Sequence, residues 1–296
     1  MEQYPFQMPV TPPKPPKKKR HFVLIVLILA FALFLGGQII GELMMIPLNL
    51  MISDAGIRFL LMYLSFIGID IAILVYCVLA ERDIFRSFLA ARHGGGRGNT
   101  LGQFALGLLI GFLMNGVCIL VAWLHGDLHF GVDVFRPLYL LAALLCVLIQ
   151  SGAEELVTRG YMLSALRKRY SVWLAVVLNS VSFAALHLLN PGVTVLAILN
   201  ILAIGVALSL IVVHLDSLWM AIAIHTAWNF TQNFLFGLPN SGAVSECSFL
   251  YLDAASSSVM YDAVFGVEGA LPSVIVIALL AVAVVLYAKR KKPAAA

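Results

Sequence analysis

The chain has 296 residues, of which 61% are hydrophobic and 11% charged, and its formal net charge is +4. Soluble domains hold roughly 45–50% apolar and about 25% charged residues, and the mean hydropathy here is +0.98. This composition excludes a soluble globular domain and predicts an all-α, polytopic membrane bundle. The chain has no phosphate-binding loop and no nucleic-acid motif, so we expect membrane lipid, and no nucleic acid, among its partners.

Both ends of the chain are basic. Residues 1–21 are Pro-rich and close with Lys17, Lys18, Lys19 and Arg20, a composition that cannot form an apolar core. We interpret them as a solvated cytoplasmic tail that signals topology, with attraction to anionic lipid as the alternative. Residues 289–296 form a second basic tail, which leaves 22–288 for the bundle.

The apolar runs predict the number of membrane spans. A spanning helix needs about 20 apolar residues, and eight runs qualify or nearly do so. They are 22–42, 59–80, 101–123, 138–165, 171–189, 193–213, 218–238 and 272–288. Positive residues concentrate in cytoplasmic loops. With both termini cytoplasmic, only Arg58 and Arg136 lie outside and only Arg159 lies within a span. We therefore expect eight spans with both termini inside.

Two loops differ from the rest in composition. Residues 81–100 contain a Gly-rich segment that we expect to be a flexible cytoplasmic linker. Residues 239–271 form a long outer loop with Glu246, Asp253, Asp262 and Glu268 and no Lys or Arg. We expect a solvated connector there, with a lid or a partner surface as the alternative.

Ionisable side chains within the spans point to a functional site. Such groups are costly in a bilayer unless they are paired or hydrated, and they usually mark function. The fourth run holds Glu154, Glu155 and Arg159, the fifth ends with His187, and the seventh holds His225 and Asn229. Glu42 and Asp70 lie in earlier spans and stay unassigned.

Helix geometry predicts that these residues share one depth. If the fourth and fifth spans form a hairpin that turns at 167–171, Glu154 and His187 lie roughly 22 and 27 Å from the turn. His225 and Asn229 lie roughly 10 to 17 Å into their own span. Tilt covers the remaining offset. We therefore expect polar groups from three helices to meet at one cavity.

The spacing within each group indicates its chemistry. Glu155 and Arg159 are four residues apart and can pair, while Glu154 is turned about 100° away and stays free. His225 and Asn229 form a second such pair and would offer two donors to an oxyanion. A carboxylate and an imidazole beside a poorly hydrated cavity can deprotonate water. The set suffices for peptide-bond hydrolysis, and Gly160 would allow a close helix approach.

These residues resemble the CPBP family, the CAAX proteases and bacteriocin-processing enzymes. Its three motifs are Glu-Glu-x-x-x-Arg, Phe-x-x-x-His and His-x-x-x-Asn or Asp. Here they begin at Glu154, Phe183 and His225, in the family's order and on separate spans. The resemblance covers about residues 138–238. Thr158 departs from it, because an aromatic residue is common at that position.

The resemblance implies an α-helical intramembrane endopeptidase. It implies that Glu154 and His187 activate water, that His225 and Asn229 form the oxyanion site, and that Glu155, Arg159 and Phe183 support them. No cofactor is expected, and the substrate would be a membrane-associated peptide or lipidated protein. The brevity of the loops favours the plasma membrane.

Three alternatives stay open. A non-catalytic immunity or peptide-binding protein could use the same fold. A proton-coupled transporter could also use buried Glu and His, but it should show repeat symmetry between its halves, and here the polar residues crowd into the second half. Within the protease hypothesis, Glu154, His187 and His225 could bind zinc. We favour a metal-free mechanism because the chain lacks a His-Glu-x-x-His helix.

Overall fold

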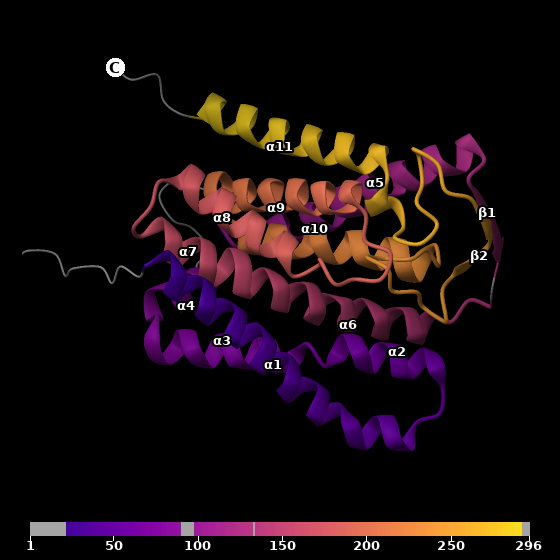
Figure 1. Ribbon diagram of the computed structural model, residues 1–296, viewed down its shortest axis with the longest axis horizontal. Helices are drawn as coiled ribbons and strands as arrows, with labels where there is room; N and C mark the ends of the chain where they lie inside the picture. Colours follow the sequence, from indigo (N-terminus) through magenta and orange to yellow (C-terminus); the bar gives the residue numbers. More distant parts are fainter. Residues whose placement is uncertain (1–21, 90–97, 133, 292–296) are drawn as a thin grey trace, which may run out of the picture.

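The computed structural model describes residues 22–89, 98–132 and 134–291. The first basic tail, residues 292–296 of the second, and residues 90–97 of the loop that we expected to be a flexible linker lie outside these residues. The described chain is an α-helical bundle, as predicted, with its long helices side by side (Figure 1). The helices are α1 (Val23–Met51), α2 (Ala55–Leu64), α3 (Ile67–Ala80), α4 (Arg82–Leu89), α5 (Leu101–His125), α6 (Pro137–Glu155), α7 (Leu163–Arg167), α8 (Val172–Ala185), α9 (Val195–Leu215), α10 (Leu218–Phe230) and α11 (Leu271–Lys291).

Within the described residues, six helical segments are long and apolar enough to cross a membrane, as expected of a multi-pass membrane protein. They are 23–51, 55–80, 101–125, 137–167, 195–215 and 271–290. Two of the eight predicted spans are shorter than expected. α8 has 14 residues, and α10 has 13 before a π-helix, η2 (Thr231–Leu235), extends it. The prediction of eight spans therefore stays open at these two helices.

Polar N-caps begin several helices at the predicted turns. Ser171 accepts a hydrogen bond from the backbone of Leu174 at the start of α8. Thr194 and Ser217 do the same for α9 and α10. Such caps satisfy backbone N–H groups that lack a partner within the helix. The turn between α7 and α8 falls at 168–171, where the hairpin was expected.

The helix α6 divides the bundle into two sides. Figure 1 shows α1, α2 and α3 along one side of α6 and α8 to α11 along the other. α5 packs closely on α10, and the contact requires glycine at two positions of α5. A Cβ atom on Gly107 would lie 2.7 Å from the carbonyl oxygen of Met220, and a Cβ atom on Gly111 would overlap the carbonyl oxygen of Ile224. Small residues permit this approach in membrane bundles, and it holds α10 against α5 and near the middle of the bundle.

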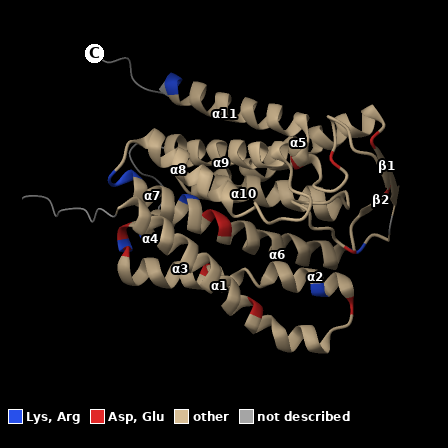
Figure 2. Ribbon diagram, in the orientation of Figure 1, with Lys and Arg blue, Asp and Glu red and all other residues tan. Residues whose placement is uncertain are grey.

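The outer loops contain a small sheet that the sequence did not predict. β1 (Leu128–Val132) pairs antiparallel with β2 (Leu250–Ala255), with an irregularity between His129 and Phe130. A short 3-10 helix, η3 (Val267–Gly269), leads from this loop into α11. Lys and Arg gather at the opposite end of the bundle, around α4, α7 and the end of α11 (Figure 2).

Candidate active site

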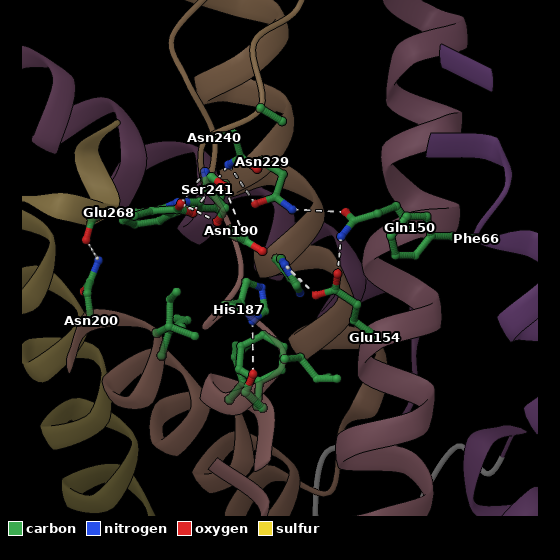
Figure 3. Close-up of a pocket in the computed structure, with 18 of the residues that line it drawn as sticks. Phe66, Gln150, Glu154, His187, Asn190, Asn200, Asn229, Asn240, Ser241 and Glu268 are labelled. Atoms are coloured by element: carbon green, nitrogen blue, oxygen red, sulfur yellow. Dashed lines mark hydrogen bonds and ion pairs between the residues drawn. The ribbon is translucent and has the colours of Figure 1, made fainter. Parts of the chain in front are cut away.

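The predicted site residues surround one cavity of about 300 Å³. Its walls come from α6, α8, α9 and α10, with α1 and α2 on one side and the outer loop on another. Glu154, His187, Asn229 and Glu268 all lie at this cavity (Figure 3). His225 lines the cavity as well. The structure therefore brings together the four residues that the sequence predicted to converge, and it adds Glu268 and other residues from the loop.

The first motif lies where α6 changes into a π-helix, η1 (Leu156–Met162). Wide turns of this kind occur often at functional sites. Thr158, the residue that departs from the family pattern, donates its hydroxyl to the carbonyl oxygen of Glu154 over 2.6 Å. This bond satisfies a carbonyl at the junction. Gly160 faces Phe88 of α4, where a Cβ would lie 2.9 Å from the ring, so the close approach expected there is to a side chain.

Glu155 and Arg159 form the predicted ion pair. Arg159 Nη1 lies 2.8 Å from Glu155 Oε1, and both side chains are fully buried. Arg159 also donates to Thr158 and stacks its guanidinium 4.1 Å from the centre of the Phe183 ring. A cation over an aromatic face is attracted to its electrons. Phe183 thus packs against Arg159.

His225 lies between the two glutamates of the first motif. Its Nδ1 is 3.0 Å from Glu155 Oε1, and its Nε2 is 3.8 Å from Glu154 Oε2. The first distance is a hydrogen bond and the second is too long for one. The sequence predicted that His225 pairs with Asn229 and shares a cavity with Glu154, but it did not predict a bond with Glu155. The structure joins it to the first motif as well.

His187 has its tautomer set by the backbone. Its Nδ1 lies 3.0 Å from the carbonyl oxygen of Phe183. A carbonyl can only accept, so Nδ1 carries the proton and the neutral ring keeps a lone pair on Nε2. The Phe183 ring also meets the His187 ring edge to face, with centroids 5.0 Å apart. The four-residue spacing of Phe183 and His187 places the two rings on one face and permits this contact.

Asn229 is connected to Glu154 through Gln150, which was not predicted from the sequence. Asn229 Nδ2 donates to Gln150 Oε1 over 3.1 Å, and Gln150 Nε2 donates to Glu154 Oε1 over 2.6 Å. Gln150 precedes Glu154 by four residues on the same helix face. That spacing is the signal by which it could have been found.

The outer loop supplies three further polar residues, which the sequence did not predict. Glu268 accepts from Trp228 Nε1, from the Ser241 backbone and hydroxyl, and from Asn240 Nδ2. Burial raises the pKa of Glu268, and the hydrogen bonds from Ser241 oppose that shift. The loop is therefore part of the cavity wall and is more than a solvated connector. An acidic residue directly before an apolar run was the one available signal.

Glu42, Asp70 and Asn179 are membrane-embedded polar residues that do not line the cavity. Glu42 accepts hydrogen bonds from Gln38 and Ser65, where α1 passes the junction of α2 and α3. It therefore has partners other than Asp70, whose Oδ1 is buried without a partner among the described residues. Asn179 donates to Ser209, which is an interhelical bond.

Whether the side chains at the cavity could bind a metal ion depends on how they are arranged. Within residues 22–89, 98–132 and 134–291, no group of three or more His, Cys, Asp and Glu side chains is arranged to hold a metal ion. Glu154, His187 and His225 line one cavity without forming such a cluster. The absence of a cofactor stays a prediction.

The comparison with known proteins agrees with the motifs. Residues 136–231 match the family model described as type II CAAX prenyl endopeptidase Rce1-like. No curated protein matches the chain significantly. The matched segment holds all three motifs, and it ends before Asn240, Ser241 and Glu268. Over residues 136–231, the chain thus contains a domain of the type II CAAX prenyl endopeptidase Rce1-like family.

Proposed function

We propose that the protein is an intramembrane endopeptidase that hydrolyses a peptide bond with water activated by Glu154 and His187. The family match supports endopeptidase activity in general. The observation that carries the proposal is the meeting of a carboxylate, two imidazoles and an amide at one largely apolar cavity within the helices.

Glu154 is suited to act as the general base. One of its oxygens accepts from Gln150, and the other has no hydrogen-bond partner among the described residues. A carboxylate oxygen at a cavity can take a proton from water. His187 presents the lone pair of Nε2, because Nδ1 is held by the backbone. It orients the water or shares its proton.

His225 and Asn229 are suited to stabilise the oxyanion. Nδ1 of His225 is engaged by Glu155, so a protonated ring has its Nε2–H available. Asn229 Nδ2 uses one hydrogen for Gln150 and has a second. As water adds to the carbonyl carbon, these donors meet the negative charge that forms on oxygen. The proton taken from water then passes to the leaving nitrogen as the C–N bond breaks.

The lining of the cavity supports a lipidated or membrane-embedded substrate. Phe34 of α1, Met62 of α2, Phe66 at the junction of α2 and α3, and Leu186 in the turn after α8 face it. Apolar walls with a few polar groups favour an apolar ligand whose reacting group is held in place. The matching family is one of type II CAAX prenyl endopeptidases, which favours a prenylated C-terminus. The plasma membrane is our proposed location.

The test uses wild type, Glu154→Gln and a matched control, Glu42→Gln. Glu42 is also a glutamate on a membrane-spanning helix, but it lies outside the cavity lining. Each purified protein is incubated with farnesylated, geranylgeranylated and unmodified C-a-a-X peptides, and products are read by mass spectrometry. We expect cleavage by wild type and the control and none by Glu154→Gln.

The other outcomes separate the alternatives. Equal cleavage by Glu154→Gln would remove Glu154 as the base. No cleavage by any of the three proteins would contradict the proposal for this substrate class and favour the immunity or peptide-binding alternative.

A further inference from the structure

Glu268 is a buried carboxylate at the cavity that none of the three motifs contains. It is 9% exposed and lies in η3, beyond the segment that matches the family model. Asn200 of α9 fixes the backbone here, because its Nδ2 donates to the carbonyl oxygen of Glu268 over 2.9 Å. The side chain is therefore directed into the cavity wall by its own backbone position (Figure 3).

The neighbours of Glu268 fix which groups donate. Trp228 Nε1 donates to Oε1 over 3.1 Å, and the backbone N–H of Ser241 donates to Oε2 over 2.7 Å. An indole and a backbone N–H can only donate. Both oxygens of Glu268 are thus acceptors, and Asn240 must turn its NH₂ group, not its carbonyl oxygen, toward Oε1, at 3.4 Å.

The same NH₂ group of Asn240 sets the orientation of Asn229. Asn240 Nδ2 also donates to Asn229 Oδ1 over 3.2 Å. With its oxygen held there, Asn229 has its Nδ2 on the opposite side, where it donates to Gln150. A flipped Asn229 amide would face the NH₂ of Asn240 with its own NH₂, two donors without an acceptor. Buried amides in that state cost about 1–3 kcal/mol.

The side-chain amides of Asn240, Asn229 and Gln150 form a series that ends at Glu154, and Glu154 requires the same orientation of Asn229. Glu154 can only accept when ionised, so Gln150 turns its Nε2 to Glu154 and its Oε1 to Asn229. Two carboxylates, Glu268 and Glu154, therefore impose one direction on three amides between them (Figure 3). Each bond in the series supports the next.

We propose that Glu268 is a positioning residue, which acts through Asn240 to hold the Asn229 amide with its N–H groups on the Glu154 side of the cavity. This inference rests on the proposed function, since it concerns the oxyanion donor of that reaction. It makes the outer loop a working part of the site. Glu268 contacts Asn240, Ser241 and Trp228, and its effect on the reaction passes through Asn229.

The alternative is that Glu268 only anchors the loop through Ser241 and Trp228. Two variants separate these roles. Glu268→Gln places an NH₂ group where one of the two oxygens accepts. Asn240→Ala leaves the bonds from Ser241 and Trp228 to Glu268 in place and removes the amide that bonds to both Glu268 and Asn229. Glu246→Gln is the matched control, an exposed carboxylate of the same loop.

The experiment is a double-mutant cycle with Asn229→Ala, measured on the C-a-a-X peptide that wild type cleaves fastest. Asn229→Ala should lower kcat by about 10²–10³ for the loss of one oxyanion donor. Glu268→Gln and Asn240→Ala should each lower kcat by about 10-fold to 10²-fold through misplacement, with KM unchanged. Combining either with Asn229→Ala should lower kcat no further, because groups that act through one residue are not additive.

Two results would overturn the proposal. One is a double variant whose loss in kcat equals the product of the two single losses. The other is an Asn240→Ala variant with wild-type kcat, which would leave Glu268 as a loop anchor only. Glu246→Gln should match wild type throughout.

Thermal unfolding in detergent keeps the two proposals distinguishable. If wild type cleaves none of the peptides, the proposed function fails. The connection from Glu268 through Asn240 to Asn229 is then still tested by Tm. Connected residues predict that Glu268→Gln with Asn229→Ala lowers Tm by less than the sum of the two single losses, because both variants break the connection through Asn240. A loss equal to the sum of both would contradict the connection.

Discussion

His225 and Glu155, from the third and first motifs, are joined by a hydrogen bond of 3.0 Å between Nδ1 and Oε1. The same Glu155 oxygen lies 2.8 Å from Arg159. One carboxylate oxygen therefore serves a structural ion pair and a catalytic candidate at once. Two carboxylates face one guanidinium in this cluster, so one further proton shared by Glu154 and His225 makes it neutral. Glu155 and Arg159 thereby contribute to the charge at the centre of the proposed reaction.

Glu155→Gln should destabilise the protein as well as inactivate it. The substitution leaves Arg159 as a fully buried charge without its ion-pair partner, and breaking such a pair costs about 3–5 kcal/mol. The measurement is Tm in detergent. The control is Glu155→Gln combined with Arg159→Met, which removes both charges and should recover part of the loss. A Glu155→Gln variant with wild-type Tm would contradict the role of the pair.

Peptide cleavage should survive exhaustive chelation. The proposed reaction takes its base from Glu154 and its oxyanion donors from His225 and Asn229, so no step uses a metal. The measurement is the cleavage rate before and after treatment with a chelator, with elemental analysis of the protein. Loss of activity that returns on adding Zn²⁺ would favour the metalloenzyme alternative, in which the same histidines and glutamate act as ligands.

The motif residues could be predicted because each is an ionisable or amide group within an apolar helix, where helix spacing gives both its neighbours and its depth. This logic found Glu154, His187, His225 and Asn229, together with the ion pair of Glu155 and Arg159. It did not distinguish the partner of His225. The choice between Asn229 on its own helix and Glu155 on another depends on helix rotation, which two π-helices alter after Glu155 and after Phe230.

The loop contribution could not be predicted, because it has no periodicity. Glu268, Ser241 and Asn240 meet through irregular backbone, and their contacts with Trp228 and Asn229 are tertiary. The lengths of α8 and α10 were overestimated for a related reason. The apolar composition continues past Ala185 into the turn that carries His187, and past Phe230 into η2, so composition alone does not show where a helix ends.

Lys168→Met should lower thermal stability in a pH-dependent way. Lys168 Nζ lies 2.8 Å from both Glu81 and Asp83 and ties the α7–α8 turn to the α3–α4 junction. Partial burial of Lys168 favours its neutral form, but hydrogen bonds with Asp83 and Glu81 outweigh this and raise its pKa. For Asp83, partial burial favours the neutral form and raises the pKa. The hydrogen bond and the charge of Lys168 outweigh this, so the pKa of Asp83 is lowered overall.

The signs of these shifts define the pH window. A carboxyl group whose pKa is lowered by folding stabilises the fold above its unfolded pKa of about 3.9. This stabilisation is lost as the pH falls through the folded pKa. A lysine whose pKa is raised by folding stabilises the fold below its unfolded pKa of about 10.4. This stabilisation is lost as the pH rises through the folded pKa. The Tm difference between wild type and Lys168→Met should therefore be largest from about pH 5 to 9 and shrink in acid. Arg86→Met, an exposed cation on α4, is the control, and a difference that is constant with pH would contradict the ion pairs.

The topology predicts that the cavity loop faces away from the cytoplasm. Lys and Arg gather at the end of the bundle that holds α4 and α7 (Figure 2), and such residues mark the cytoplasmic side. The loop with Ser241 and Glu268 lies at the other end. In a Cys247→Ser background, Glu246→Cys should react with a membrane-impermeant maleimide on intact cells. Arg86→Cys, exposed on α4, should react only after permeabilisation. The reverse pattern would invert the bundle and place the loop residues of the site on the cytoplasmic side, where a prenylated cytoplasmic protein would meet them directly.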